Sequence, residues 1–254
     1  MIARAAAVLT CAVLAACSNG DDAPTGEPYD TGAAVDSDGF HAATPATAAA
    51  NAEVRAALSL EDDPDFAEAR RGLVARVEDL EIRDANGDLV WRPADYAFLD
   101  ALESAAVNPS LLRQARLNAI HGLFEVTDGV WQVRGYDLSN MSVIEGETGW
   151  IIVDPLTSVE TARAAMDLVT AELGERPVAA VIYTHSHIDH FGGVEGVASR
   201  EALASGDIEI IAPEGFIEAV ADENVLGGQV MSRRAGYMYG FFLPRTPRGH
   251  IDSG

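Results

Sequence analysis

The sequence predicts an α/β fold, a layered sheet with helices outside it. Between residues 123 and 154, alternating apolar and polar residues surround the turn dipeptides Asp128-Gly129 and Thr148-Gly149, which indicates two antiparallel hairpins. After Ser158, helix-forming segments alternate with apolar runs that have the length of strands. Antiparallel strands followed by βαβα units are typical of a sheet covered by helices.

The elements expected before the hairpins are mostly helices. Helix formers fill 48–60 and 64–73, and two further helices are expected at 96–106 and 111–120, the second starting at Asn108-Pro109-Ser110. A short strand, 89–91, follows the turn Asn86-Gly87.

The hairpin strands are expected at 123–126, 130–134, 141–145 and 150–154. A helix at 158–172 then leads to a continuous apolar strand at 178–183, and Gly192-Gly193 opens another helix. The last expected elements are a strand at 208–211 and helices at 216–220 and 229–241.

The composition excludes several classes of protein. The 254 residues include 40 Asp and Glu against 17 basic residues, all of them Arg, for a net charge of -23. Nucleic acid binding relies on Lys and Arg neutralising phosphates, so no nucleic acid partner is expected. A hydrophobic content of 48% excludes wholesale disorder.

The amino terminus has the pattern of a secretory signal. A basic start at Arg4 precedes an apolar run that is too short to span a bilayer, and Leu14-Ala15-Ala16-Cys17 resembles the end of a bacterial lipoprotein signal. Residues 1–16 are therefore expected to be a signal peptide and Cys17 the lipidation site. Residues 17–47, poor in large apolar groups, are expected to be a flexible tether. The expected location is the cell envelope, with the chain lipid-anchored and facing the periplasm or the exterior.

A cluster of metal-binding residue types follows the apolar strand 178–183. His185, His187, Asp189 and His190 lie within six residues, just before Gly192-Gly193. Imidazole and carboxylate groups suit Zn²⁺. The spacing predicts that His185 and His187 hold one ion, while Asp189 and His190 turn toward a second.

This stretch, His185-Ser186-His187-Ile188-Asp189-His190, resembles the HxHxDH motif of the metallo-β-lactamase superfamily. The stretches 121–129, 133–140, 149–155 and 233–240 resemble its alkyl sulfatase branch. The resemblance implies an αββα sandwich, two zinc ions per complete site and a catalytic role for Asp189 beside the metal-bound water. It also implies that Asp154 supports the metal loop from outside the ligand set. Asn140 is a candidate contact to substrate.

The resemblance also sets the expected domain organisation. Residues 48–121 are expected to form a helical extension, and residues 122–254 the first part of the catalytic domain. Family members continue with further ligands, a helical dimerisation region and another domain. The sequence is therefore expected to be an amino-terminal fragment of an enzyme that forms homodimers. Because its metal site is incomplete, the fragment alone is expected to be inactive.

The expected function is zinc-dependent hydrolysis of alkyl sulfate esters, such as dodecyl sulfate, to alcohol and sulfate. One alternative is another hydrolase of the superfamily that acts on a lactam, lactone or thioester. A second is a non-catalytic lipid-anchored envelope protein, if the chain is complete at Gly254. Attack at carbon and attack at sulfur both remain open.

Other polar residues are expected to have ordinary roles. His41, His121 and His250 are not expected to bind metal, and Arg233 and Arg234 are expected to pair with surface acids. Glu214, Glu218 and Glu223 are expected on a solvated helix face.

Overall fold

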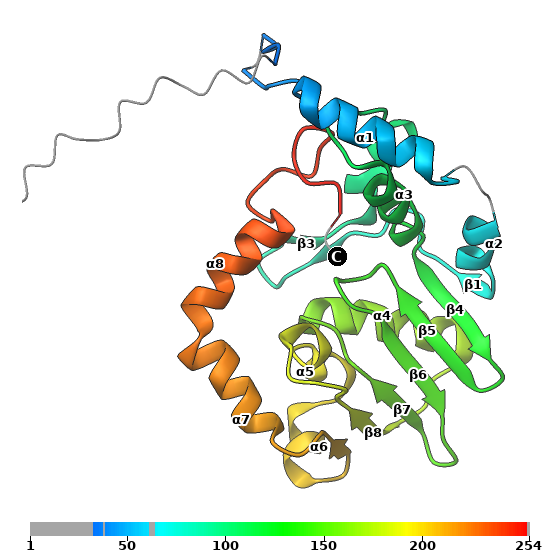
Figure 1. The fold of residues 1–254 in the computed structure, drawn as a ribbon. Helices are drawn as coiled ribbons and strands as arrows, with labels where there is room; N and C mark the ends of the chain where they lie inside the picture. Colours follow the sequence, from blue (N-terminus) through cyan, green and yellow to red (C-terminus); the bar gives the residue numbers. More distant parts are fainter. Residues whose placement is uncertain (1–32, 38, 61–63, 253–254) are drawn as a thin grey trace, which may run out of the picture.

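A seven-stranded sheet forms the centre of the molecule (Figure 1). The computed structural model describes residues 33–37, 39–60 and 64–252. The order across the sheet is β1-β4-β5-β6-β7-β8-β9, and a separate pair, β2-β3, forms a small second sheet. The strands are β1 (Leu73–Ala75), β2 (Ile82–Arg83), β3 (Leu89–Trp91), β4 (Gly122–Thr127), β5 (Val130–Arg134), β6 (Met141–Glu145), β7 (Trp150–Val153), β8 (Val178–Ile182) and β9 (Glu209–Ile211).

Helices precede, connect and follow these strands. The α-helices are α1 (Pro45–Ala57), α2 (Pro64–Arg70), α3 (Pro109–Asn118), α4 (Val159–Leu173), α5 (Val194–Val197), α6 (Arg200–Ser205), α7 (Phe216–Ala221) and α8 (Gly228–Tyr239). Three tighter or wider helical segments are η1 (Pro93–Ala101), η2 (Ile188–His190) and η3 (Asp222–Leu226), of which η3 is a π-helix.

The structure confirms the α/β class and both hairpins. Neighbouring strands from β1 to β7 are antiparallel, whereas β7, β8 and β9 run parallel to one another. Helix α4 connects the parallel strands β7 and β8, as expected of a βαβ unit. Helix α3 begins where expected, and the Asn108 side chain caps it by accepting hydrogen bonds from the backbone N–H groups of Ser110 and Leu111.

The segment before the hairpins is less helical than the sequence indicated. Helix α2 ends at Arg70 instead of reaching residue 73, because Gly72 adopts φ +75° and Leu73 enters β1. A Cβ at Gly72 would lie 2.1 Å from the Glu125 carbonyl oxygen, so only glycine allows this approach. The helix expected at 96–106 is the 3₁₀ segment η1. The extension thus contributes strand β1 to the edge of the main sheet.

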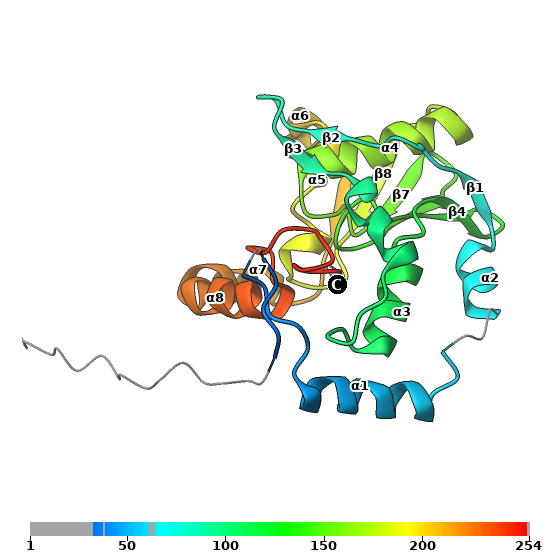
Figure 2. The same ribbon diagram turned by 90° about the horizontal axis from the view of Figure 1, so that it is seen from above.

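The main core lies between one face of the sheet and helix α4. Val133, Met141, Val143 and Ile152 are buried from the sheet, and Ala165 and Val169 face them from α4. The β2-β3 pair also contacts α4, on the same side of the sheet (Figure 2). Burial of these side chains stabilises the layers, at roughly 25 cal/mol per Å² of apolar surface removed from water.

Helices α7 and α8 lie along one side of the molecule, away from α4 (Figure 1). Several of their large apolar side chains are exposed, among them Ile217, Val230 and Tyr237. Across the described ranges, no helix is both long and apolar enough to cross a membrane. The signal peptide and Cys17 lie outside the described residues.

Candidate metal centre

The carboxyl ends of three parallel strands build the candidate site. Strands β7, β8 and β9 run in the same direction, so the segments that follow them leave from one edge of the sheet. Asp154 follows β7, and the loop with His185, His187, Asp189 and His190 follows β8. Loops at this edge are the usual position for ligand sites in sheets with parallel strands.

Two glycines let the histidine loop lie directly on the start of α4. A Cβ at Gly192 would be 2.2 Å from the carbonyl oxygen of Thr157, and one at Gly193 would be 2.2 Å from that of Pro155. The Gly193 N–H donates to the Leu156 carbonyl at 2.9 Å. The loop is therefore held against the β7–α4 connection by close backbone contact that no larger residue permits.

Asp154 is the main acceptor beneath the loop. Its Oδ1 accepts the Thr184 N–H at 2.8 Å, and its Oδ2 accepts the Thr184 hydroxyl at 2.7 Å and His190 Nδ1 at 2.8 Å. Its side chain is 10% exposed. Asp154 therefore holds Thr184 and His190 of the loop through its carboxylate oxygens.

Hydrogen bonds define which ring nitrogens of two histidines are free to bind a metal. The carboxylate of Asp154 is an acceptor, so His190 Nδ1 donates and the lone pair lies on Nε2. The single hydroxyl proton of Thr184 goes to Asp154, so His185 Nδ1, 3.0 Å from that hydroxyl oxygen, donates as well. His185 and His190 therefore both present Nε2, and their ring centroids are 4.0 Å apart.

Asp189 lies beside His190 at the same loop. Its Oδ2 is 3.2 Å from His190 Nε2. Two ligands of one tetrahedral zinc ion, at bond lengths of about 2.0–2.1 Å, are about 3.3 Å apart. The Asp189 and His190 donors thus have the separation of two ligands on one ion.

Glu223 corrects one expectation from the sequence. It was expected on a solvated face, but Glu223 Oε1 lies 3.2 Å from His187 Nε2, and its side chain is only 24% exposed. Periodicity could not predict this contact, because Glu223 lies in η3, which returns to the histidine loop only after β9 and α7. Glu214 and Glu218 are exposed, as expected.

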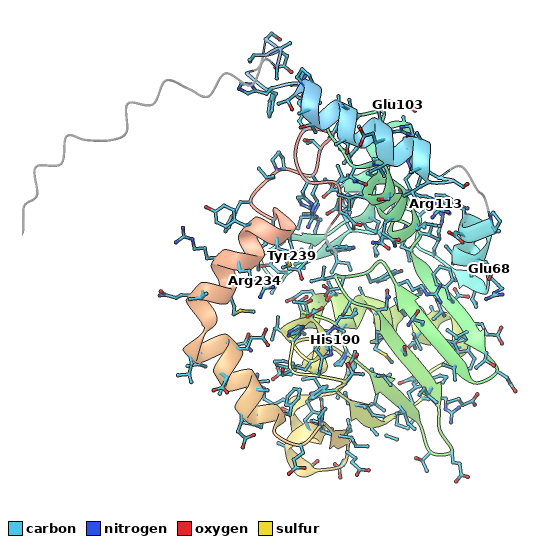
Figure 3. All side chains as sticks on the ribbon, viewed as in Figure 1. Glu68, Glu103, Arg113, His190, Arg234 and Tyr239 are labelled. Carbon is cyan, nitrogen blue, oxygen red and sulfur yellow. The ribbon has the colours of Figure 1, made fainter. Side chains whose placement is uncertain are left out.

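The donors have the chemistry that a zinc ion requires, and the ring of His185 lies close to those of His187 and of His190, which is labelled in Figure 3. The rings of His185 and His187 are 4.7 Å apart. No group of three His, Cys, Asp or Glu side chains within residues 33–37, 39–60 and 64–252 is already arranged to hold an ion. The donors therefore fit a zinc ion by their chemical type, by the short distances between them and by the ring nitrogens that they leave without a proton.

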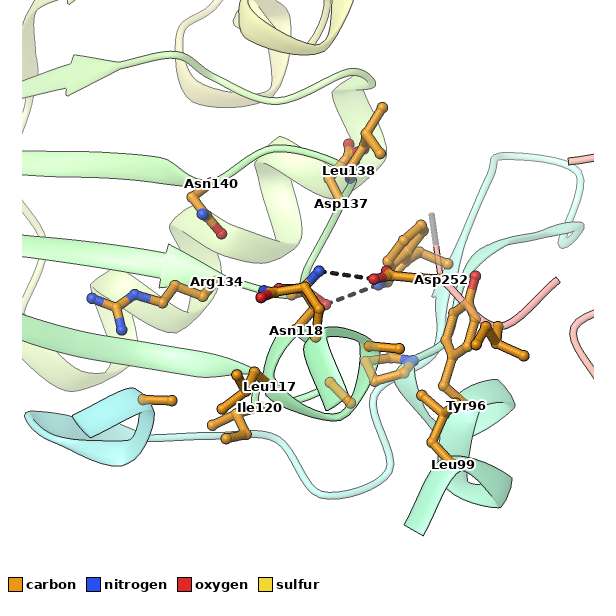
Figure 4. A pocket seen from close by; sticks show the side chains of 18 of the residues that line it. Tyr96, Leu99, Leu117, Asn118, Ile120, Arg134, Asp137, Leu138, Asn140 and Asp252 are labelled. Atoms are coloured by element: carbon orange, nitrogen blue, oxygen red, sulfur yellow. Dashed lines mark hydrogen bonds between the residues drawn. The ribbon is translucent and has the colours of Figure 1, made fainter. Parts of the chain in front are cut away.

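Asn140 does not join this cluster in the structure. It lines a cavity of about 480 Å³ with Arg134, Asp137 and Asn118, and the lining includes none of the four loop residues (Figure 4). Its neighbour Ser139, which sequence analysis missed, is buried and donates its hydroxyl to the Asp189 backbone oxygen. Only the tertiary contact identifies Ser139.

The residues that were not expected to bind metal lie elsewhere or in other contacts. His121 contacts the carbonyl oxygens of Ala119 and Val77, and the ring of His250 packs edge-on against Tyr96. Arg233 and Arg234 are exposed on α8.

Residues 134–251 match the family described as the metallo-beta-lactamase superfamily. This part of the chain therefore carries a metallo-beta-lactamase domain. Such a domain implies a divalent metal ion, commonly zinc.

Within the superfamily, the chain is similar to alkylsulfatases. It is 48% identical over 214 residues to the linear primary-alkylsulfatase of Pseudomonas sp., covering 84% of this chain and 32% of that protein. It is 47% identical over 211 residues to the alkyl/aryl-sulfatase BDS1 of Saccharomyces cerevisiae, covering 83% and 33%. Relatives of this chain therefore extend beyond bacteria.

A solved structure gives the same result. The sec-alkylsulfatase Pisa1 from Pseudomonas sp. superimposes with a TM-score of 0.78 at 45% identity, covering 84% of this chain and 33% of that one. The chain spans about a third of the length of these relatives.

Proposed function

We propose that this chain carries the first part of the metal centre of an alkylsulfatase, which hydrolyses alkyl sulfate esters to an alcohol and sulfate. The observation that supports this most is the 46–48% identity to three alkylsulfatases over 82–84% of the chain. A contiguous match of 209 residues or more necessarily includes the histidine loop.

The proposed metal is zinc, with two ions in a complete site. His185 and His190 would donate Nε2, His187 would donate Nδ1, and Asp189 would donate a carboxylate oxygen. When bound, the ions supply a water of lowered pKa and neutralise charge on the sulfate oxygens. Asp154 holds the His190 proton on Nδ1 and so keeps Nε2 available.

The reaction consumes one water per ester: the bridging C–O or S–O bond breaks, and the products are the alcohol and hydrogen sulfate. Hydrolysis in ¹⁸O-labelled water distinguishes the two bonds, because label in the alcohol requires attack at carbon and label in sulfate requires attack at sulfur.

Sulfate release from dodecyl sulfate, measured together with zinc content, tests the proposed function. The longer protein that contains this sequence is expected to bind two zinc ions per chain and to release sulfate. His187→Ala is expected to abolish both. Sulfate release that survives removal of zinc by a chelator would contradict the proposal.

We also propose that Cys17 anchors the protein to a membrane of the cell envelope through acyl chains. We propose no nucleic acid partner for it. Two or more acyl chains hold a protein on a bilayer stably, whereas one does not. Cys17→Ser is expected to move the protein from the membrane fraction to the soluble fraction. Retention in membranes after this change would refute the anchor.

A further inference from the structure

Each of the three parallel strands supplies a group to the candidate site. Strand β7 is followed by Asp154, and β8 by the histidine loop. Strand β9 is followed by α7 and then by the π-helical segment η3, which brings Glu223 to His187. The sequence gives Glu223 no motif, so its placement is a property of the fold.

An aromatic cluster holds the start of α7 beside the histidine loop. Phe216, the first residue of α7, stacks on Tyr183 at the end of β8, with ring centroids 5.4 Å apart. Phe216 also packs edge-on against Phe191, which directly follows His190, at the same centroid distance of 5.4 Å. Aromatic pairs in these geometries stabilise a contact beyond the surface that they bury. These ring contacts pack the start of α7, the helix that precedes Glu223, against the histidine loop.

The π-helical turn follows directly. The Gly227 N–H donates to the Asp222 carbonyl at 2.8 Å, five residues back, which is the hydrogen bond of a π-turn. Such turns inside helices occur frequently at functional sites. Glu223 lies within this turn, and its side chain is far less exposed than those of the neighbouring Val225 and Leu226.

His187 needs an external group to orient its ring. Its side chain is 57% exposed, against 22% for His190. His190 is held by Asp154 and His185 contacts the Thr184 hydroxyl, whereas the polar contact recorded for the His187 ring among the described residues is Glu223. Histidines that bind metals nearly always donate their second ring N–H to a carboxylate, carbonyl or water.

We propose that Glu223 is a positioning residue of the metal centre: its carboxylate accepts the Nε2–H of His187 and thereby presents Nδ1 of that ring to the metal. This inference rests on the metal site of the proposed function. Glu223 then does for His187 what Asp154 does for His190. Removing such a supporting group lowers metal affinity by about 10- to 100-fold.

Zinc affinity of the metal-free protein, measured by competition with a chromogenic chelator, tests the inference. Glu223→Ala is expected to raise the zinc dissociation constant about 10- to 100-fold and to change the visible spectrum of the Co²⁺-substituted site. Glu223→Gln keeps an acceptor oxygen and is expected to recover part of the affinity. Glu218→Ala, an exposed glutamate on α7, is the matched control and is expected to behave as the parent protein.

Two results would overturn the inference alone. The first is that Glu223→Ala binds zinc as tightly as Glu218→Ala does. The second is that Glu223→Ala loses zinc affinity, Glu223→Gln does not restore any of it, and the metal-free variants show a matching drop in melting temperature, which would explain the loss. Failure of the parent protein to bind zinc would instead refute the proposed function, and the role of Glu223 with it. Zinc binding by the parent protein therefore distinguishes failure of this inference from failure of the proposed function.

Discussion

Asp154→Asn is the substitution that most directly tests how the histidine loop is held. Asp154 has φ +56°, a backbone conformation that asparagine tolerates better than most residues, so the exchange adds little backbone strain. The side chain keeps its shape and one carbonyl oxygen, which can still accept the Thr184 N–H. Its second oxygen becomes an amino group, which cannot accept the proton of His190 Nδ1.

Two costs follow from this exchange. If His190 keeps its proton on Nδ1, a largely buried donor loses its acceptor, which costs about 1–3 kcal/mol of unfolding free energy. If the proton moves to Nε2, the ring regains a partner, but the nitrogen beside Asp189 no longer has a lone pair for the metal. We therefore expect the zinc dissociation constant to rise about 10- to 100-fold, equivalent to about 1.4–2.8 kcal/mol.

Urea unfolding of the metal-free protein and chelator competition for zinc measure the two costs separately. Asp167→Asn is the matched control, because Asp167 is exposed on the same helix that the loop packs against. If Asp154→Asn binds zinc as tightly as Asp167→Asn does, Asp154 does not set the tautomer of His190 and the reasoning is wrong.

Two further predictions concern packing and burial. Gly193→Ala would place a Cβ 2.2 Å from the Pro155 carbonyl oxygen, so we expect a loss of about 1–3 kcal/mol or more in urea unfolding, whereas Gly228→Ala, with open space around it, should be nearly neutral. An equal effect of both changes would contradict the packing argument. Burial raises the pKa of Tyr136 to about 12, above its ordinary value of 10.0. The folded chain therefore keeps the phenol proton where the unfolded chain loses it, and the free energy of unfolding should fall as the pH rises from about 10 to about 12. Tyr136→Phe should reduce this fall, measured by urea unfolding at graded pH; an unchanged pH dependence would show that Tyr136 is not its source.

The sequence alone determined the local structure of the sheet and the clustering of histidines in one loop. The turn at Asp128-Gly129 connects β4 and β5, and the apolar run before His185 is strand β8. These features depend on side-chain alternation and turn chemistry, which act over a few residues and can be read directly from the chain. The spacing of His185, His187, Asp189 and His190 is local in the same sense.

Tertiary structure decided which residues support that loop. Gly72 ended α2 early and sent Leu73 into β1, because the close approach to Glu125 comes from a strand about 50 residues away. Glu223 reaches His187, and Ser139 reaches Asp189, across separations that no periodicity encodes. Such contacts depend on how strands order themselves in the sheet and on where the segments after them return. Glu223 therefore looked solvated in the sequence and lies at the histidine loop in the fold.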